Sequence, residues 1–305
     1  MNHDGGCSGY DNTMVGSINI YTDHFGLTER PFTLVPDPDF LFWSRNHKHT
    51  YTMLEYGLMT KAPITLITGE VGAGKTTLLH YLLKDISEEI VIGLISNAHG
   101  DGERGELLRW VLLALDQDAP REATYVELFN QFQQYLIKEY AKGRRIVLIF
   151  DEAQNLSARA LEELRMYTNI NSNKDELLQL ILVGQPELRD IVRGPELKQF
   201  AQRVSANFHL SEMDMDSVHA YIAHRLRKAG AARMIFTREA CALIHSATKG
   251  IPRLINQLCD FSLVYASSDK RKTVNEGTVR NVLNDGIFFP PYPLDLDKED
   301  KCDLT

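Results

Sequence analysis

A segment of eight residues directly follows a short apolar run and has the residue types and the spacing of a phosphate-binding loop. The segment Gly69-Glu-Val-Gly-Ala-Gly-Lys-Thr76 fits the pattern G-x-x-x-x-G-K-[ST], with the apolar run Ile64–Thr68 before it and a helix-forming segment after it. The glycines let the main chain bend so that successive N–H groups point at phosphate oxygens. The positive end of the following helix adds to this field. The segment therefore predicts a nucleoside triphosphate site.

Each side chain that closes this loop has an expected role. We expect Lys75 to reach the β and γ phosphates, the Thr76 hydroxyl to ligate Mg²⁺, and Thr77 to add a phosphate contact. The residues expected to bind the nucleotide, ATP, are Gly69, Glu70, Val71, Gly72, Ala73, Gly74, Lys75, Thr76, Thr77 and, much later in the chain, Arg253.

Two carboxylates follow the apolar run Ile146–Phe150. A buried parallel strand ending in acids places them at the carboxyl edge of the sheet, where α/β proteins bind ligands. We expect Asp151 to join Thr76 in the Mg²⁺ shell and Glu152 to polarise the attacking water. Apolar runs often end in exposed acids, so the position downstream of a phosphate-binding loop carries this interpretation.

Two more polar residues stand where they would sense the γ-phosphate. Gln185 follows the apolar run Leu180–Val183 after one glycine, and we expect it to orient water or contact the γ-phosphate. The alternative is that Gln185 is a turn residue before Pro186. Arg253 begins a helix after Gly250-Ile-Pro, where a cation does not favour its own helix dipole. A contact with the γ-phosphate is therefore the expected role of Arg253.

Arg203 lies just before the expected strand Val204–Leu210, at the edge of the core. An arginine there is suited to reach the γ-phosphate of a neighbouring chain as an arginine finger. The alternative is a surface salt bridge, which contributes little. Arg189 and Arg193 compete for the same role. The expected catalytic residues are thus Glu152, Lys75, Asp151, Gln185, Arg203 and Arg253.

Alternating strands and helices must position these residues, and that order predicts an α/β fold with a parallel five-stranded sheet. The expected strands are Ile64–Thr68, Ile90–Ile95, Ile146–Phe150, Leu178–Val183 and Val204–Leu210. The expected helices between them are Lys75–Ile86, Glu103–Leu115, Tyr125–Tyr140 and Ala158–Thr168. From Asp214 onward only helices are expected. Thr237 and Thr273 are their expected N-caps, the latter in a capping box with Glu276.

Composition excludes several classes of protein. The chain has 305 residues with 44% hydrophobic and 24% charged residues, which is ordinary globular usage and excludes a disordered or collagen-like chain. No window approaches the roughly 20 apolar residues of a membrane span. A net charge of −8 argues against a protein that coats nucleic acid along its length. The four scattered cysteines, Cys7, Cys241, Cys259 and Cys302, form neither a zinc nor a disulfide pattern. Without a signal peptide, the expected location is cytoplasmic.

The pattern divides the chain into four parts. We expect a disordered tail at 1–20, an ATPase core at 21–212, a helical lid at 213–289 and an acidic disordered tail at 290–305. Residues 213–290 contain 11 Lys and Arg against 7 Asp and Glu, whereas residues 63–212 contain 16 against 22. The cationic excess of the lid fits either ordinary solvated helix faces or a patch for DNA or an acidic partner.

Taken together, these elements resemble the AAA+ ATPases, and within them the general secretion pathway protein A (ExeA) type. That type includes ATPases found with exopolysaccharide and exosortase gene sets. The resemblance covers about 21–285. Its most specific segments are His24-Phe-Gly-Leu-Thr-Glu-Arg-Pro-Phe32, Pro36-Asp-Pro-Asp-Phe-Leu-Phe42, His47, Leu54-Glu-Tyr-Gly-Leu58, Asp151-Glu-Ala-Gln-Asn-Leu156, Gly184-Gln-Pro-Glu-Leu188 and Gly250-Ile-Pro-Arg253.

The resemblance implies a strand order of 5-1-4-3-2, a helical lid and a nucleotide bound between sheet and lid. It also implies that the segment around Phe32–Phe42 packs near the adenine, with plain core packing as the alternative. We expect no direct cell-wall role, because these 305 residues contain neither a transmembrane helix nor the peptidoglycan-binding domain of the secretion ATPase.

These observations lead to one main functional expectation. We expect an Mg²⁺-dependent ATPase that forms a nucleotide-dependent homo-oligomer and remodels a partner, such as envelope, secretion or polysaccharide-export proteins. A peripheral position at the inner membrane would fit that role. The alternative is an ATP-switched DNA-binding oligomer of the transposition-regulator or origin-recognition type. We do not expect a small-molecule kinase, because it would need an acceptor pocket. We do not expect a helicase either, because it would need a second motor domain.

Overall fold

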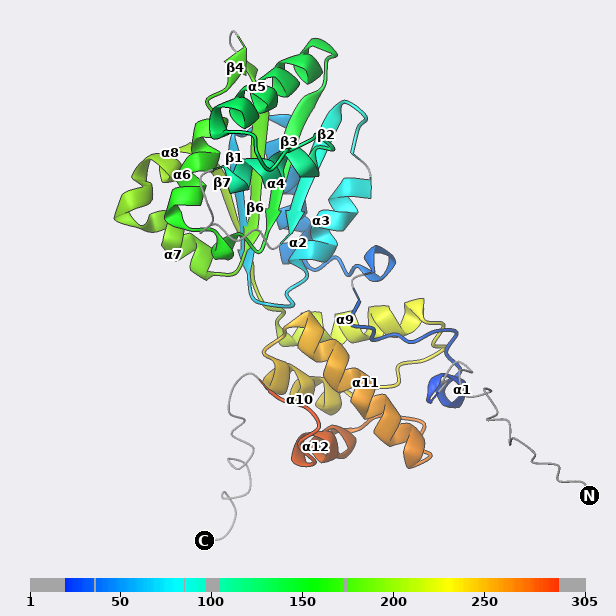
Figure 1. The fold of residues 1–305 in the computed structure, drawn as a ribbon. Coiled ribbons are helices and arrows are strands. Elements are labelled where there is room, and N and C mark those ends of the chain that lie inside the picture. Colours follow the sequence, from blue (N-terminus) through cyan, green and yellow to red (C-terminus); the bar gives the residue numbers. More distant parts are fainter. Residues whose placement is uncertain (1–19, 36, 85, 97–104, 173–174, 291–305) are drawn as a thin grey trace, which may run out of the picture.

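The computed structural model describes residues 20–35, 37–84, 86–96, 105–172 and 175–290 of the chain. A sheet covered by helices occupies one end of the molecule, and a group of helices occupies the other (Figure 1). The predicted tails 1–20 and 290–305 lie outside the described residues, apart from Ile20 and Pro290. Cys7 and Cys302 lie outside them as well.

Five parallel strands form the sheet in the order β2-β3-β6-β1-β7. The strands are β1 (Ile64–Gly69), β2 (Ile90–Ser96), β3 (Arg145–Asp151), β6 (Leu178–Gly184) and β7 (Val204–Leu210). Numbered by their succession in this sheet, the order reads 5-1-4-3-2 from the β7 edge. The predicted fold class and strand order are therefore confirmed. A separate antiparallel pair, β4 (Asn171–Ser172) and β5 (Asp175–Glu176), was not predicted.

Alternate residues along each strand pack against helices on opposite faces of the sheet. On β3, Ile146, Leu148 and Phe150 belong to one apolar cluster, whereas Val147 and Ile149 belong to another. The first face is covered by α4 (Glu106–Ala114), α5 (Tyr125–Ala141), α6 (Ala158–Tyr167), α7 (Glu187–Arg193) and α8 (Lys198–Arg203). The other face is covered by α2 (Arg45–Met59) and α3 (Lys75–Lys84).

The helical part contains α9 (Met215–Lys228), α10 (Arg238–Thr248), α11 (Pro252–Ser268) and α12 (Glu276–Asn284). Its interior is apolar and includes the buried Cys241 and Cys259. The segment Gly250-Ile-Pro252 separates α10 from α11, as predicted, with Pro252 in the first turn of α11.

The two predicted caps have different outcomes. Thr237 caps α10 by accepting a hydrogen bond from the main-chain N–H of Ala240. The prediction for Thr273 was wrong, because α12 begins only after Asn275, whose side chain accepts from the N–H of Thr278. The physical reason is a long-range pairing: Val274 N–H donates to Ile235 O at 2.9 Å, which holds the chain extended where the capping box would need to turn.

The N-terminal segment packs against the C-terminal helices rather than against the sheet. It contains the short helices α1 (Thr22–Phe25) and η1 (Pro38–Phe40). Tyr21, Leu27 and Phe32 belong to the same buried cluster as α9 to α12. Arg30 adds a salt bridge to Asp260 of α11 at 2.6 Å. The segment therefore runs from the lid to the nucleotide edge of the sheet, while the division of the chain at 212/213 stays a prediction.

Several helices were not predicted from the sequence. These are α1, α2, α7 and α8, together with the short elements η1, η2 (Ala153–Asn155) and η3 (Pro195–Leu197). The predicted helix Glu103–Leu115 begins at Glu106 in the described residues, since 103 and 104 lie outside them.

Candidate nucleotide site

The predicted phosphate-binding loop joins β1 to α3 at the carboxyl edge of the sheet, where its pattern requires it to lie. Gly72 has φ of 82°, a left-handed conformation that other residues adopt only at a cost. A side chain there would also collide with the lid, because an added Cβ would lie 2.5 Å from Arg253 Cβ. The loop therefore needs glycine at this position both for its bend and for its close approach to α11.

Lys75 is buried at the start of α3, with 7% of its surface exposed. Its ammonium donates hydrogen bonds to Gly69 O at 2.7 Å and Glu70 O at 3.0 Å. Burial lowers the pKa of this ammonium, and the negative charges of Glu152 and Asp151 oppose that shift. The lysine thus lies in the centre of the loop beside both predicted carboxylates.

Thr76 and Asp151 come together as a metal site requires. The Thr76 hydroxyl donates to Asp151 Oδ2 at 3.1 Å, although the two residues lie 75 positions apart. One hydroxyl and one carboxylate suit Mg²⁺, which takes its remaining ligands from phosphates and water. Within the described residues there is no group of three His, Cys, Asp or Glu side chains able to hold a metal alone. The residues present therefore fit an ion that arrives with the triphosphate.

Glu152 follows β3 in a left-handed conformation, with φ of 57° and ψ of 38°. This conformation costs a residue with a Cβ about 1–2 kcal/mol, so the surrounding contacts must hold it. Its carboxylate oxygen Oε2 accepts from Gln154 Nε2 at 2.6 Å and from Gln185 Nε2 at 3.3 Å. The structure therefore brings the predicted Gln185 to the predicted Glu152, through side chains from two neighbouring strands.

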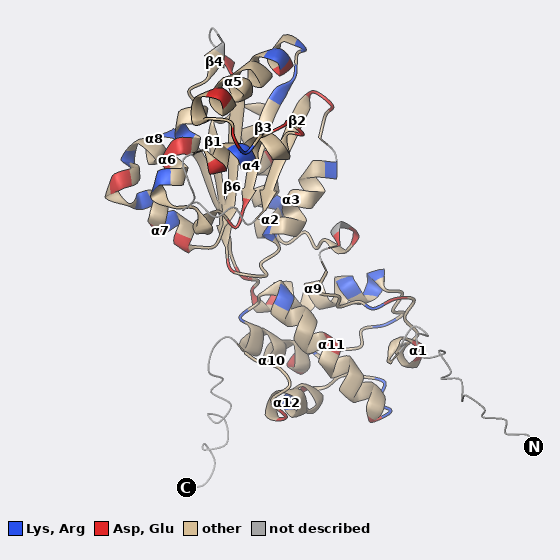
Figure 2. Ribbon diagram, viewed as in Figure 1, with Lys and Arg blue, Asp and Glu red and all other residues tan. Residues whose placement is uncertain are grey.

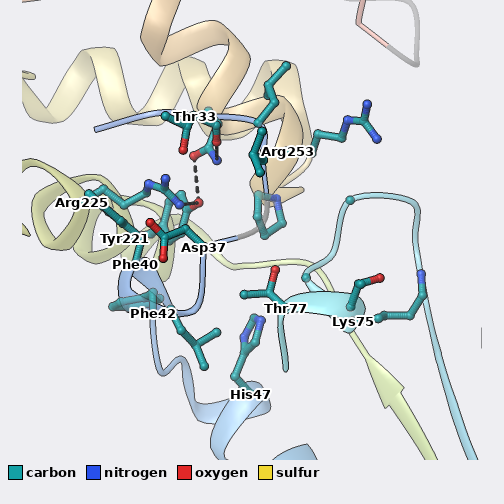
Figure 3. A pocket seen from close by; sticks show the side chains of 18 of the residues that line it. Thr33, Asp37, Phe40, Phe42, His47, Lys75, Thr77, Tyr221, Arg225 and Arg253 are labelled. Carbon is teal, nitrogen blue, oxygen red and sulfur yellow. Dashed lines mark hydrogen bonds between the residues drawn. The ribbon is translucent and has the colours of Figure 1, made fainter. Parts of the chain in front are cut away.

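A pocket between the loop and the lid is lined from both sides (Figure 3). The loop side contributes Lys75, Thr76, Thr77 and Glu152, and the lid side contributes Arg253. Arg253 also donates its main-chain N–H to Gly72 O at 3.2 Å, which ties the start of α11 to the loop. The predicted lid residue thus lies against the predicted phosphate loop.

The far end of this pocket is aromatic and comes from the N-terminal segment and α9. Phe40 and Phe42 line it, whereas Phe32 lies in the core of the helical part. The guanidinium of Arg225 lies 4.7 Å from the centroid of the Phe40 ring, and its Nε donates to Pro31 O at 2.5 Å. An aromatic wall beside a phosphate loop suits a nucleobase.

His47 of α2 packs against the phosphate loop. It lies in the first turn of α2, where the Ser44 hydroxyl is 2.8 Å from its Nδ1, and an added Cβ at Gly74 would lie 3.2 Å from its Nε2. Burial lowers the pKa of His47 to about 4, with a smaller opposing effect from the main chain of Ala73. The imidazole is therefore neutral at physiological pH and packs against the phosphate loop.

Arg203 does not lie at the pocket of its own chain. It precedes β7, whose first residue pairs with Ile64 at the amino edge of β1, whereas the phosphate loop follows the carboxyl edge of that strand. Six residues of strand separate the two edges, roughly 20 Å at 3.3 Å per residue. The guanidinium bonds to Asn169 and lies 3.7 Å from Glu176. Any contact with a triphosphate would therefore involve a neighbouring chain.

The two competing arginines lie on α7, which follows the carboxyl edge of β6. Arg193 is exposed and forms a 3.9 Å ion pair with Asp190. Arg189 is partly buried, and its Nε has no hydrogen-bond partner among the residues that the structure describes.

Sequence reasoning assigned no role to Gln154, Arg225 or Asn256, yet all three hold the site together. Asn256 Nδ2 donates to Thr33 O at 3.1 Å, and its Oδ1 accepts from the Tyr221 hydroxyl at 2.8 Å. The sequence did indicate a structural role for Arg225. It is a charged residue on the apolar face of a predicted helix, and a buried charge requires a polar partner.

Known proteins are similar to this chain in sequence and in fold. A family model described as an AAA domain matches residues 59–192. General secretion pathway protein A of Aeromonas hydrophila is 40% identical over 247 residues, which cover 81% of this chain and 45% of that protein. The chain thus spans less than half the length of this relative.

Solved structures with low sequence identity share the fold. Drosophila ORC bound to DNA aligns with a TM-score of 0.65 and 13% identity, covering 94% of this chain and 70% of that one. Cdc6p of Pyrobaculum aerophilum aligns with a TM-score of 0.63 and 16% identity, covering 87% and 70%. At these identities the likeness shows the fold alone.

The parallel sheet, the phosphate loop at its carboxyl edge and the helices that meet that loop define a P-loop nucleoside triphosphatase. The matches narrow this class. The chain contains an AAA domain at residues 59–192 within an AAA+ ATPase fold, and over 247 residues it is similar to general secretion pathway protein A.

Proposed function

We propose that the chain hydrolyses ATP to ADP and phosphate, with Mg²⁺, in the pocket between the phosphate loop and the lid. The observation that carries the proposal is that Lys75 and Thr76, at the start of α3, and Glu152, directly after β3, line one pocket, with Asp151 bonded to Thr76. Mg²⁺ bound by Thr76 and Asp151 would neutralise phosphate charge.

The residues of this chain supply the remaining parts of such a reaction. Lys75 and the loop N–H groups stabilise negative charge on the transferring group, which is where most phosphoryl-transfer catalysis lies. Glu152 accepts a hydrogen bond from the attacking water and orients it. Gln185 holds the Glu152 carboxylate, and Arg253 brings the lid to the γ-phosphate end of the pocket.

The substitution Glu152→Gln tests this assignment. The variant keeps the size of the side chain and loses the carboxylate, so we expect unchanged ATP affinity and turnover reduced by about 100-fold or more. Phosphate release and equilibrium nucleotide binding are measured on the same preparation. Full turnover by the variant would remove Glu152 from its role.

We further propose that nucleotide state controls assembly and that the assembled ATPase acts on a secretion or envelope partner, at the inner-membrane surface. The similarity to general secretion pathway protein A supports this partner class. Among the described residues, none of the helices is both long and apolar enough to span a bilayer. Sizing of the protein with and without a non-hydrolysable ATP analogue tests the assembly: one mass in both conditions would contradict it.

DNA as the partner is tested in the same preparation. The cations of α9 gather in its last turn, at Arg225, Arg227 and Lys228 (Figure 2). The helix dipole stabilises cations at this end of α9 even when no ligand is bound. We therefore expect no stimulation of turnover by duplex DNA at low salt. Stimulation that falls as salt rises would instead indicate the DNA-switched class.

A further inference from the structure

The Gln154 side chain links two predicted catalytic residues that come from different strands. Its Nε2 donates to Glu152 Oε2 at 2.6 Å, and its Oε1 accepts from the main-chain N–H of Gln185 at 3.0 Å. We propose that Gln154 is a positioning residue for ATP hydrolysis: it fixes the Glu152 carboxylate to the end of β6, in the orientation that activates water. This inference rests on the proposed role of Glu152.

The chemistry of the two partners fixes the direction of this amide. A main-chain N–H only donates, so the amide oxygen must face Gln185, and an ionised carboxylate only accepts, so the NH₂ must face Glu152. A flipped amide would oppose two donors at one end and two acceptors at the other. The bridge therefore has a single favourable orientation, and only a side chain with both a donor and an acceptor can form it.

The main chain is shaped to bring the amide to this position. The left-handed turn at Glu152 begins the short helix η2, in which Asn155 N–H donates back to Glu152 O at 3.0 Å. Gln154 is thereby turned toward β6. An added Cβ on Gly184 would lie 2.9 Å from Gln154 Oε1 and 2.7 Å from Leu188 Cδ2, so the end of β6 leaves room for the amide only with glycine there.

The consequence for Glu152 is a carboxylate held at one oxygen. Both Gln154 and Gln185 donate to Oε2, which restricts rotation of the carboxylate and leaves Oε1 to accept from the attacking water. Because both donors are anchored at the end of β6, movement of that strand end on nucleotide binding would be transmitted to Glu152. Loss of the bridge should therefore slow turnover without weakening nucleotide binding.

The main test replaces Gln154 with glutamate. Gln154→Glu keeps the length of the side chain and its bond from Gln185 N–H, but it places a second carboxylate against Glu152. Asn155→Asp is the matched control, because it adds the same charge one residue later on an exposed side chain. Gln154→Ala, compared with Asn155→Ala, removes the bridge without adding charge.

We expect both Gln154 variants to lower kcat by about 10- to 100-fold, since a misplaced general base loses much of its contribution. ATP affinity should stay within about twofold of the controls.

Three outcomes would overturn the inference. If kcat matches the Asn155 controls while Glu152→Gln is inactive, Gln154 does not position the carboxylate, and the proposed function stands. If both Gln154 variants lose nucleotide binding or unfold, the amide holds the loop and not the carboxylate. If Glu152→Gln keeps full turnover, the proposed role of Glu152 fails first, and the inference fails with it.

Discussion

Gly72 of the phosphate loop lies against Arg253 of the lid, and the substitution Gly72→Ala tests this contact. Two costs arise in the variant. A left-handed conformation costs alanine about 1–2 kcal/mol, and Gly72 has φ of 82°. The added Cβ would lie 2.5 Å from Arg253 Cβ, an overlap of the kind that costs about 1–3 kcal/mol. The sum is about 2–5 kcal/mol.

Gly143→Ala separates the two costs. Gly143 has φ of 76° and nothing within 4 Å of an added Cβ, so this variant carries only the backbone cost. The overlap with Arg253 should therefore appear as the difference between the variants, about 1–3 kcal/mol. If α11 moves away from the loop to relieve the overlap, the same free energy appears as weaker ATP binding, by about 10- to 100-fold.

Urea unfolding and calorimetric titration with a non-hydrolysable ATP analogue measure both quantities on each variant. We expect Gly72→Ala to lose more unfolding free energy, more nucleotide affinity, or both, than Gly143→Ala. Equal behaviour of the two variants in both assays would refute the close approach of the lid to the loop.

Three further predictions concern the fold and the assembly. Because burial lowers the pKa of His47 to about 4, the unfolded chain binds more protons below pH 6.5; stability should fall by up to about 3 kcal/mol as pH drops from 6.5 to 4. His47→Gln should lose this component in urea unfolding, and an unchanged pH dependence would contradict the burial. Leu164→Ala, at a fully buried position of α6, should cost about 2–5 kcal/mol of unfolding free energy; a loss below 1 kcal/mol would show that the site collapses freely. Arg203→Ala should leave ATP binding intact and lower turnover only at protein concentrations where chains assemble, and unchanged turnover there would exclude it as the finger.

The strands could be predicted from the sequence because their signals are local. β1, β2, β3 and β6 are short, mainly apolar runs, and β7 alternates apolar with polar residues. The observed limits of the five strands differ from the predicted ones by at most one residue at either end. The helices α7 and α8 were missed because Gly194 and Pro195 interrupt a short segment and obscure its period. Thr273 was mistaken for a cap because its local pattern is correct, while the bridge between Phe236 and Val274 is a long-range pairing.

The same distinction between local and distant signals applies to the site. The phosphate loop and the Asp151–Glu152 pair could be found because each is one continuous motif after one strand. Gln154 and Asn256 could not be assigned roles, since their partners Gln185 and Thr33 lie 31 and 223 residues away. Side chains that tie together distant segments become visible only when the fold has brought those segments into contact.

The central claim is that a nucleoside triphosphate binds between the phosphate loop and the lid. Calorimetric titration of the full chain with a non-hydrolysable ATP analogue and Mg²⁺ tests it most directly, with Lys75→Ala titrated in parallel. We expect saturable binding of one nucleotide per chain, lost in the Lys75 variant because the buried ammonium that faces the phosphates is gone. Absence of binding by the unaltered chain, or equal binding by the variant, would contradict the claim.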